Sequence, residues 1–155
     1  MQIIRAQPQD AGALTQIAHA AKRHWNYRKN WIQKWEDVLT LRPEVIAENP
    51  AYCAIDEGRP IGFYVLTSEA GKLHLDHLWI LPNEIGRGVG RRLFEHAVQT
   101  VKRLGNKTII IESDPNAEGF YKRMGARRIG ETVTTIEGQC RELPVLQYDF
   151  PQTMT

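Results

Sequence analysis

The chain has 155 residues, of which 42% are hydrophobic and 25% charged, and a formal net charge of +2. This length and composition are typical of one soluble globular domain, expected to span residues 1–155. The charge is too small to indicate nucleic-acid binding, and no apolar run is long enough to span a bilayer. The first residues, MQIIRAQPQDAG, lack the pattern of a signal peptide. The two cysteines, Cys53 and Cys140, without CxxC spacing, predict inert thiols in a cytoplasmic protein.

The N-terminal part of the chain combines one short strand with helices. MQIIRA has the composition of a strand, and apolar residues then recur at helical spacing over residues 9–27. Asp10 stands where an N-cap is expected. A second helical segment is predicted near residues 29–39, and Pro43 is placed to open a third over 43–49.

From residue 51 the pattern changes to the two-residue period of strands. AYCAID and PIGFYVLTS flank the turn-like DEGRP, which predicts a hairpin. In the next strand, KLHLDHLWIL, the alternation of apolar and polar residues is broken at Asp76 and His77. Without a correction, the apolar residues before the break would point to one face of the strand and those after it to the other. A slip of one residue exchanges the two faces of a strand, and a β-bulge restores the pattern. Such a bulge is typical of an active site or of plain sheet curvature.

The C-terminal part contains one clear amphipathic helix. Its apolar stripe is formed by Val89, Leu93, Ala97 and Val101, broadened by Phe94, Val98 and Leu104. Gly105 is expected to end it. A buried-type strand, KTIIIES, a turn with a short helix, DPNAEGFYKRMGA, and two strands, RRIGETVTTI and LPVLQYDF, complete the chain. This order predicts a mixed α/β sheet in one layer with helices on it.

Three glycines, Gly86, Gly88 and Gly90, precede this helix in ILPNEIGRGVGRRLFEHA. The first N–H groups of a helix have no internal partner and carry the positive end of its dipole, so this turn predicts an anion site. Positive charge is added there by Arg87, Arg91 and Arg92. A tight structural turn is the alternative. The spacing fits neither a P-loop nor a dinucleotide turn, although another nucleotide-phosphate site stays possible.

Two motifs resemble one family. LDHLWILPNEIGRGVGRRLFEHA resembles the acyl-CoA pyrophosphate motif of the GNAT superfamily of N-acetyltransferases, and DPNAEGFYKRMGARRIGE resembles its second cofactor motif. The resemblance implies an α/β (α+β) fold with a single-layer, mostly antiparallel sheet, a bulged central strand and helices on both faces. It implies direct transfer of acetyl from acetyl-CoA, a co-substrate, to a primary amine of a small-molecule or peptide acceptor, without a metal.

The resemblance also assigns residue roles. Tyr121 would protonate the leaving thiolate, although it is otherwise a core aromatic. The backbone N–H near Ile80 would stabilise the oxyanion. The general base is sought among His74, Asp76 and His77: the resemblance favours an acidic residue of this strand, and His77 has the more suitable ordinary pKa. Side chains that only face solvent or satisfy the sheet are the alternative. Contacts with acetyl-CoA are expected from Ile80, Leu81, Gly86, Arg87, Gly88, Val89, Gly90, Arg91, Asn116 and Phe120. Ile85 stands where the family usually has Gln or Arg, which leaves the pyrophosphate to backbone N–H groups.

The acceptor side depends on the segment HWNYRKNWIQKW and the bulged strand. Trp25, Tyr27 and His74 are predicted to contact the acceptor, with His24 and Asn26 nearby; packing against the sheet is the alternative for the tryptophans. The basic residues Lys22, Arg23, Arg28 and Lys29 indicate a solvated face or a negatively charged acceptor. A non-catalytic acyl-CoA sensor of the same fold is the competing function. The last strands are candidates for a homodimer contact.

Overall fold

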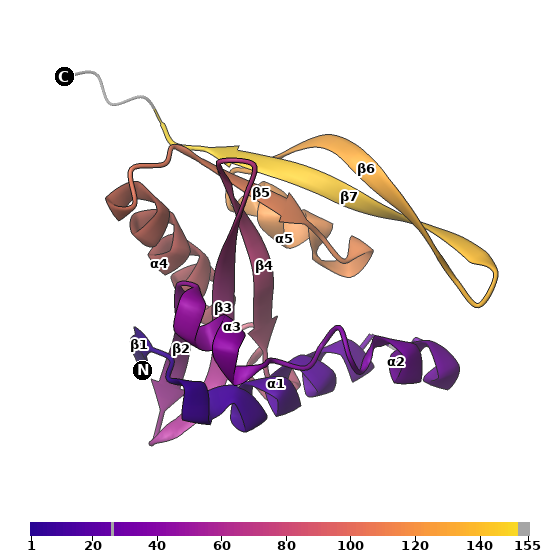
Figure 1. Ribbon diagram of the computed structural model, residues 1–155, viewed down its shortest axis with the longest axis horizontal. Coiled ribbons are helices and arrows are strands. Elements are labelled where there is room, and N and C mark those ends of the chain that lie inside the picture. Colours follow the sequence, from indigo (N-terminus) through magenta and orange to yellow (C-terminus); the bar gives the residue numbers. More distant parts are fainter. Residues whose placement is uncertain (26, 152–155) are drawn as a thin grey trace.

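The computed structural model describes residues 1–25 and 27–151 (Figure 1). The helices and 3-10 turns are η1 (Pro8–Asp10), α1 (Ala11–Arg23), α2 (Lys29–Trp35), α3 (Pro43–Glu48), η2 (Pro82–Glu84), α4 (Val89–Arg103), η3 (Pro115–Ala117) and α5 (Glu118–Arg123). The strands are β1 (Gln2–Arg5), β2 (Ala51–Asp56), β3 (Arg59–Glu69), β4 (Lys72–Ile80), β5 (Thr108–Glu112), β6 (Arg127–Ile136) and β7 (Gln139–Asp149).

The strands form one sheet in the order β1-β2-β3-β4-β5-β7-β6. Neighbouring strands are antiparallel except β4 and β5, which are parallel. The buried residues of α1 and α3 pack in one cluster with Phe63 and Val65, whereas those of α4 and α5 pack in another with Tyr64 and Leu66. Because consecutive residues of a strand point to opposite faces, these clusters lie on the two sides of β3. The predicted fold class is confirmed.

Three hairpins turn on two residues with positive φ. Glu57 and Gly58 join β2 to β3, Ala70 and Gly71 join β3 to β4, and Glu137 and Gly138 join β6 to β7. Positive φ at both central residues defines the type I′ turn, whose twist matches that of the flanking strands. The first of these turns is the one predicted at DEGRP. The third lets β6 and β7 extend far beyond the rest of the sheet, with their tip near α2 (Figure 1).

The predicted bulge is present in β4. Val65 pairs with His77, and its neighbour Leu66 pairs with Leu75, so Asp76 is the extra residue. The bulge moves Leu78 and Ile80 onto the α4 side of the sheet, where the leucines before the bulge also pack. The break in the alternation therefore corresponds to a β-bulge, after which the side chains of β4 point to the faces of the sheet opposite to those of an uninterrupted alternation.

Strands β4 and β5 separate soon after they meet. They are paired only at Leu73 with Ile109 and at His74 with Ile110. Farther along β4, the N–H of Leu81 donates to the carbonyl of Ile61 at 2.9 Å. Because hydrogen-bonded pairs alternate along an antiparallel ladder, the N–H of Ile80 points away from β3, towards the opening beside β5.

Two details of the helices differ from the sequence predictions. Leu104 was expected to broaden the apolar stripe of α4, but it is 53% exposed because it follows the last helical turn. Asp10 is the N-cap residue of α1, as predicted, but its carboxylate accepts from the N–H of Gln7 at 2.8 Å and closes η1 instead of bonding to α1. Gly105 ends α4 with a φ of 80°, as predicted.

Leu93 anchors α4 to the sheet and is fully buried. We expect Leu93→Ala to lower the free energy of unfolding by about 3 kcal/mol, because it leaves a cavity in the core. Urea denaturation followed by circular dichroism measures this loss. Leu104→Ala on the same helix is the matched control and is expected to change stability by less than about 0.5 kcal/mol. Equal effects of the two substitutions would contradict this packing.

Candidate active site

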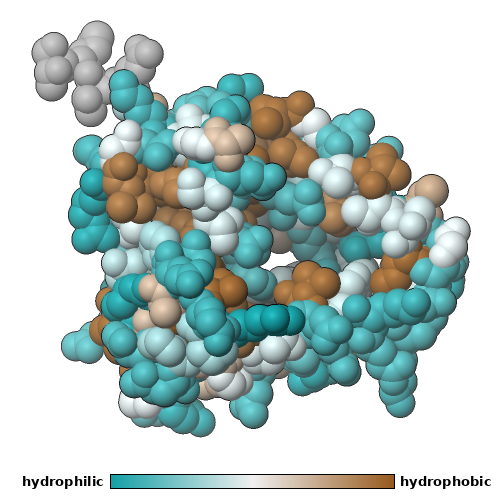
Figure 2. All heavy atoms as spheres, in the orientation of Figure 1, coloured by the Kyte–Doolittle hydropathy of each residue, from teal (hydrophilic) through white to brown (hydrophobic). Residues whose placement is uncertain are grey.

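A cavity of about 280 Å³ lies where β4 and β5 separate. In Figure 2 the surface is hollowed near the centre, between the helices α1 and α2 below and the β6–β7 hairpin above and to the right. The cavity is lined by six of the predicted site residues: Trp25, Asp76, Ile80, Asn116, Phe120 and Tyr121. The structure therefore brings together residues from the turn after α1 and from β4, η3 and α5. A more open hollow of about 450 Å³ lies elsewhere, around Arg5, Tyr52 and Arg103.

The glycine turn ends at the N-terminus of α4 in the conformation that an anion cradle needs. Gly86 and Gly88 have φ of 86° and 80°, a left-handed region that favours glycine, and Gly88 is the N-cap residue. The first backbone bond into the turn is donated by the N–H of Arg92 to the carbonyl of Gly88, at 3.1 Å. The N–H groups of Val89, Gly90 and Arg91 thus lie in the orphan first turn of the helix. Open space surrounds both left-handed glycines.

Gly90 is required by close packing rather than by its φ. A Cβ there would lie 2.7 Å from Cδ1 of Ile80 and 3.2 Å from the ring of Phe120. This close approach joins the helix start to the cavity wall. The N–H groups at the start of α4 therefore fit a pyrophosphate group.

Charged side chains around the turn are engaged with acidic partners. Arg87 pairs with Glu84 at 3.1 Å and Arg91 pairs with Glu95 at 3.2 Å, both arginines being exposed. Ile85 is half exposed and lines the cavity. Because its side chain is apolar and cannot donate a hydrogen bond, anionic oxygens of a ligand at this turn would be bound by the backbone N–H groups.

The side chain of Tyr121 is buried at the cavity wall. Phe94 and Phe120 hold its ring, with centroids 6.0 and 5.2 Å away. Burial, and to a smaller extent the nearby carboxylate of Asp114, raises the pKa of Tyr121 well above its ordinary value. Its phenol is therefore protonated at neutral pH and available as a proton donor.

Asp76 and His77 lie side by side at the bulge, but they differ in freedom. Nδ1 of His77 accepts from the indole N–H of Trp79 at 3.0 Å, and its Nε2 lies 3.6 Å from the carboxylate of Asp76. With Nδ1 occupied as an acceptor, the neutral ring carries its proton on Nε2. Burial lowers the pKa of His77, although Asp76 opposes the shift. Asp76 is about half exposed and lines the cavity.

His74 does not line the cavity. It pairs with Thr67 and Ile110 before the bulge, and its Nε2 lies 4.0 Å from Glu69. Its predicted contact with the acceptor stays a prediction without a supporting contact. Glu112, at the end of β5, does line the cavity and was missed. Nothing local in KTIIIES distinguishes it, because only the separation of β4 from β5 opens that strand end to the cavity.

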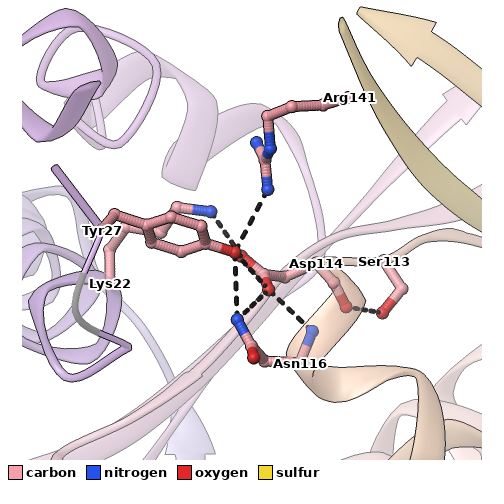
Figure 3. Close-up of polar contacts among 6 residues, drawn as sticks. All are labelled: Lys22, Tyr27, Ser113, Asp114, Asn116 and Arg141. Carbon is pink, nitrogen blue, oxygen red and sulfur yellow. Dashed lines mark hydrogen bonds and ion pairs between the residues drawn. The ribbon is translucent and has the colours of Figure 1, made fainter. Parts of the chain in front are cut away.

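A buried polar cluster closes the cavity on the side of α1 (Figure 3). Lys22 donates to Asp114 at 2.5 Å, and both side chains are only 9% exposed. The hydroxyl of Tyr27 donates to the same carboxylate at 2.9 Å and accepts from Asn116 at 3.0 Å and from Arg141 at 3.1 Å. Three distant segments of the chain thus meet at one phenol oxygen.

The charges of this cluster stabilise one another. Burial alone would raise the pKa of Asp114, but the ammonium of Lys22 and the hydrogen bonds from Lys22, Asn116 and Tyr27 outweigh it and hold the pKa below its ordinary value. Burial and the same carboxylate raise the pKa of Tyr27. Lys22 also lies 4.2 Å from the ring centroid of Trp35.

The tryptophans divide between packing and the cavity. Trp31 and Trp35 pack against Tyr27, with centroids 6.1 and 4.9 Å from its ring. Trp25 is 39% exposed and lines the cavity. The predicted contribution of Asn26 lies outside the described residues.

Neither cysteine reaches the cavity. Cys53 lies in the core on the α1 side, where burial raises its pKa to about 11, and Cys140 is exposed on β7. Within residues 1–25 and 27–151, no group of three or more metal-ligating side chains is gathered. No helix in this part of the chain is long and apolar enough to cross a membrane.

The sequence model of the acetyltransferase (GNAT) family matches residues 14–126. The chain belongs to this family. The protein is therefore an acetyl-CoA-dependent acetyltransferase. The matched range includes the bulge, the glycine turn and Tyr121. The recognition of the family from the two motifs is confirmed.

Individual relatives agree with this assignment. The chain is 33% identical over 112 residues to the peptidyl-lysine N-acetyltransferase YjaB of Salmonella typhimurium, covering 72% of each protein. It is similar in fold to a GCN5-related N-acetyltransferase from Rhodopseudomonas palustris (TM-score 0.83, 19% identity, 96% of this chain and 95% of the other). It also resembles the PaiA N-acetyltransferase from Thermoplasma acidophilum in complex with coenzyme A (TM-score 0.73, 19% identity, 96% and 98%).

Removal of the carboxylate from the polar cluster tests its electrostatics. We expect Asp114→Asn to lower the free energy of unfolding by about 3 kcal/mol at pH 7, because it leaves the ammonium of Lys22 buried without a counter-charge. Urea denaturation measures the loss. Glu95→Gln, which removes an exposed charge from α4, is the control and is expected to cost less than about 0.5 kcal/mol.

The same variant has a defined pH dependence. Because the pKa of Asp114 is lower in the folded state than its ordinary value of 3.8, the carboxylate stabilises the fold above that pH. This stabilisation is lost as the pH falls through the folded-state pKa. The difference in stability between the wild type and Asp114→Asn should therefore shrink below about pH 4. A difference that stays constant down to pH 2 would contradict the ion pair.

Proposed function

We propose that this enzyme acetylates the side-chain amine of lysine in a peptide or protein, by direct attack of the amine on acetyl-CoA. The observation that carries the proposal is the meeting, in one cavity, of the Tyr121 phenol and the open edge of β4 at Ile80. The relative from Salmonella typhimurium, named for peptidyl-lysine acetylation, supports lysine as the acceptor. Residues 1–155 are proposed to act as one domain.

Acetyl-CoA would be held by the glycine turn and the separated strands. The N–H groups at the start of α4 would bind its pyrophosphate, and Phe120 and Asn116 would border its arm. The thioester is the activated acyl group that this co-substrate supplies. The N–H of Ile80, turned towards the opening, is placed to donate to the thioester oxygen as negative charge grows there.

Proton transfer is assigned to side chains on the cavity wall. The lysine ammonium must lose a proton before it attacks, and Asp76 lines the cavity with a carboxylate that is about half exposed. We assign Asp76 as the base or as the group that holds a base water, and His77 as a positioning residue beside it. Tyr121 donates its proton to the departing sulfur. Asp76 and Glu112 also attract the cationic amine into the cavity.

A protein that binds acetyl-CoA without turnover is the competing proposal. Ile85 favours it, since this position offers no donor to the pyrophosphate. The orientation of Tyr121 at the cavity disfavours it, because a sensor needs no proton donor there. Release of free CoA in the presence of lysine peptides distinguishes the two.

Tyr121→Phe tests the proton donor. We expect kcat to fall roughly 10²-fold with little change in the KM for acetyl-CoA, because only protonation of the leaving thiolate is lost. Release of free CoA measures the rate. Tyr148→Phe is the matched control, because Tyr148 also packs against Phe94, at 5.4 Å between centroids, but does not line the cavity. Unchanged kcat in Tyr121→Phe would remove this role.

Substitution of the acidic residues tests the base. We expect Asp76→Asn to lower kcat/KM roughly 10²-fold and to remove the fall in rate at low pH, since the amide cannot accept a proton. Glu112→Gln is expected to raise the KM for the peptide with a smaller effect on kcat. Reversal of these two effects would transfer the role of base to Glu112.

A further inference from the structure

Hydrogen-bond donors without acidic partners gather around Trp31, beside the polar cluster. The guanidinium carbon of Arg28 lies 5.5 Å from the ring centroid of Trp31, and that of Arg141 lies 5.9 Å from it. The indole N–H of Trp31 is buried and has no hydrogen-bond partner among the described residues. Two cations and an unsatisfied N–H thus share one aromatic ring.

The two arginines differ from the other cations of this region. Lys22 is paired with Asp114, and Lys34 is paired with Glu137 at 3.3 Å. Within the described part of the chain, neither Arg28 nor Arg141 lies within ion-pair distance of a carboxylate. Arg141 donates only to the phenol oxygen of Tyr27, at 3.1 Å, a neutral acceptor. An arginine has five donor hydrogens, so most of the donor capacity of Arg141 is unused.

These donors lie close to the cavity. Tyr27 bonds at the same oxygen to Arg141 and to Asp114, and Asp114 lines the cavity. The guanidinium of Arg141 is therefore two hydrogen bonds from the cavity wall (Figure 3). Lys22, Asp114 and Arg141 together carry one excess positive charge here, whereas Asp76 and Glu112 make the cavity itself negative. The site thus attracts a cation into the cavity and an anion beside it.

We propose that Arg28 and Arg141, whose guanidinium groups both lie against the ring of Trp31, form a carboxylate-binding subsite for an acidic residue of the acceptor peptide. The subsite rests on the proposed function, since it selects lysines that have an acidic neighbour. The planar, forked donors of two guanidinium groups match the two oxygens of a carboxylate. Two hydrogen bonds of 3.1 and 2.9 Å separate Arg141 from the cavity wall. Because one extended residue spans roughly 3.5 Å, the acidic residue lies about two positions from the target lysine.

Matched peptides test the subsite. Short, N-terminally blocked peptides with one lysine carry Glu about two positions before it, after it, or on both sides, and the reference peptide carries Gln at these positions. We expect kcat/KM to be roughly tenfold higher for the best Glu peptide, through a lower KM. Mass spectrometry locates the acetyl group, and free CoA measures the rate.

Variants assign the preference to the named residues. Arg28→Gln and Arg141→Gln should each reduce the Glu-to-Gln ratio of kcat/KM by at least about threefold. Lys29→Gln, which removes an exposed charge from the first residue of α2, next to Arg28, should keep the ratio. Thermal unfolding checks that each variant is folded. A ratio near one for the wild type, or a ratio that survives both arginine substitutions, would overturn the subsite.

A binding measurement separates this inference from the proposed reaction. Peptides in which Gln replaces the target lysine are titrated with the protein in saturating CoA, and tryptophan fluorescence gives the Kd. Tighter binding of the Glu peptide, lost in Arg28→Gln, supports the subsite even if no lysine peptide is acetylated, in which case the proposed function alone fails. Equal affinity of Glu and Gln peptides contradicts the subsite whatever the turnover.

Discussion

The separation of β4 from β5 is the constraint on which the rest of the site depends. The two strands share only two residue pairs, and beyond them β4 presents an edge without a strand partner. A buried, unpaired strand edge is costly, since each of its N–H and C=O groups needs a partner. A ligand that donates and accepts along this edge supplies those partners. The fold thus leaves an edge at which the proposed co-substrate would find backbone partners.

The other features of the site keep this opening in place from both sides. The bulge at Asp76 exchanges the faces of β4, which puts Leu78 and Ile80 over α4 and turns a carboxylate towards the cavity. Gly90 lets the start of α4 approach Ile80 and Phe120 closely. On the opposite side, the cluster of Lys22, Tyr27 and Asp114 fixes the wall near α1. In the proposed function the backbone would perform most of the binding, and few side chains would be needed.

Much of the fold follows from local patterns, and the site follows from them in part. Strand alternation predicts the bulge, because one extra residue in KLHLDHLWIL is enough to return all of its apolar side chains to the same face of the sheet. The glycine spacing likewise predicts the cradle. Leu104 and Asp10 show the limit of such patterns. The exposure of Leu104 depends on the residue at which α4 ends, and the hydrogen bond of Asp10 depends on whether η1 or α1 supplies the N–H group.

Contacts between distant segments lie beyond sequence reasoning. Lys22 and Asp114 are 92 positions apart, and Tyr27 and Arg141 are 114 apart. Each of these residues has an ordinary surface interpretation by itself: Lys22 and Arg141 are cations in polar segments, and Asp114 precedes a proline. The position of the turn between β6 and β7 fixes the length of this hairpin. That length brings Arg141 to the aromatic residues of α2.

The most direct test is an amide NMR titration with acetyl-CoA. If the turn and the open edge of β4 bind the co-substrate through the backbone, the largest amide shifts will fall on Gly86 to Arg91 and on Ile80. Shifts confined to the hollow around Arg5 and Arg103, with the glycine turn unchanged, would contradict the backbone cradle.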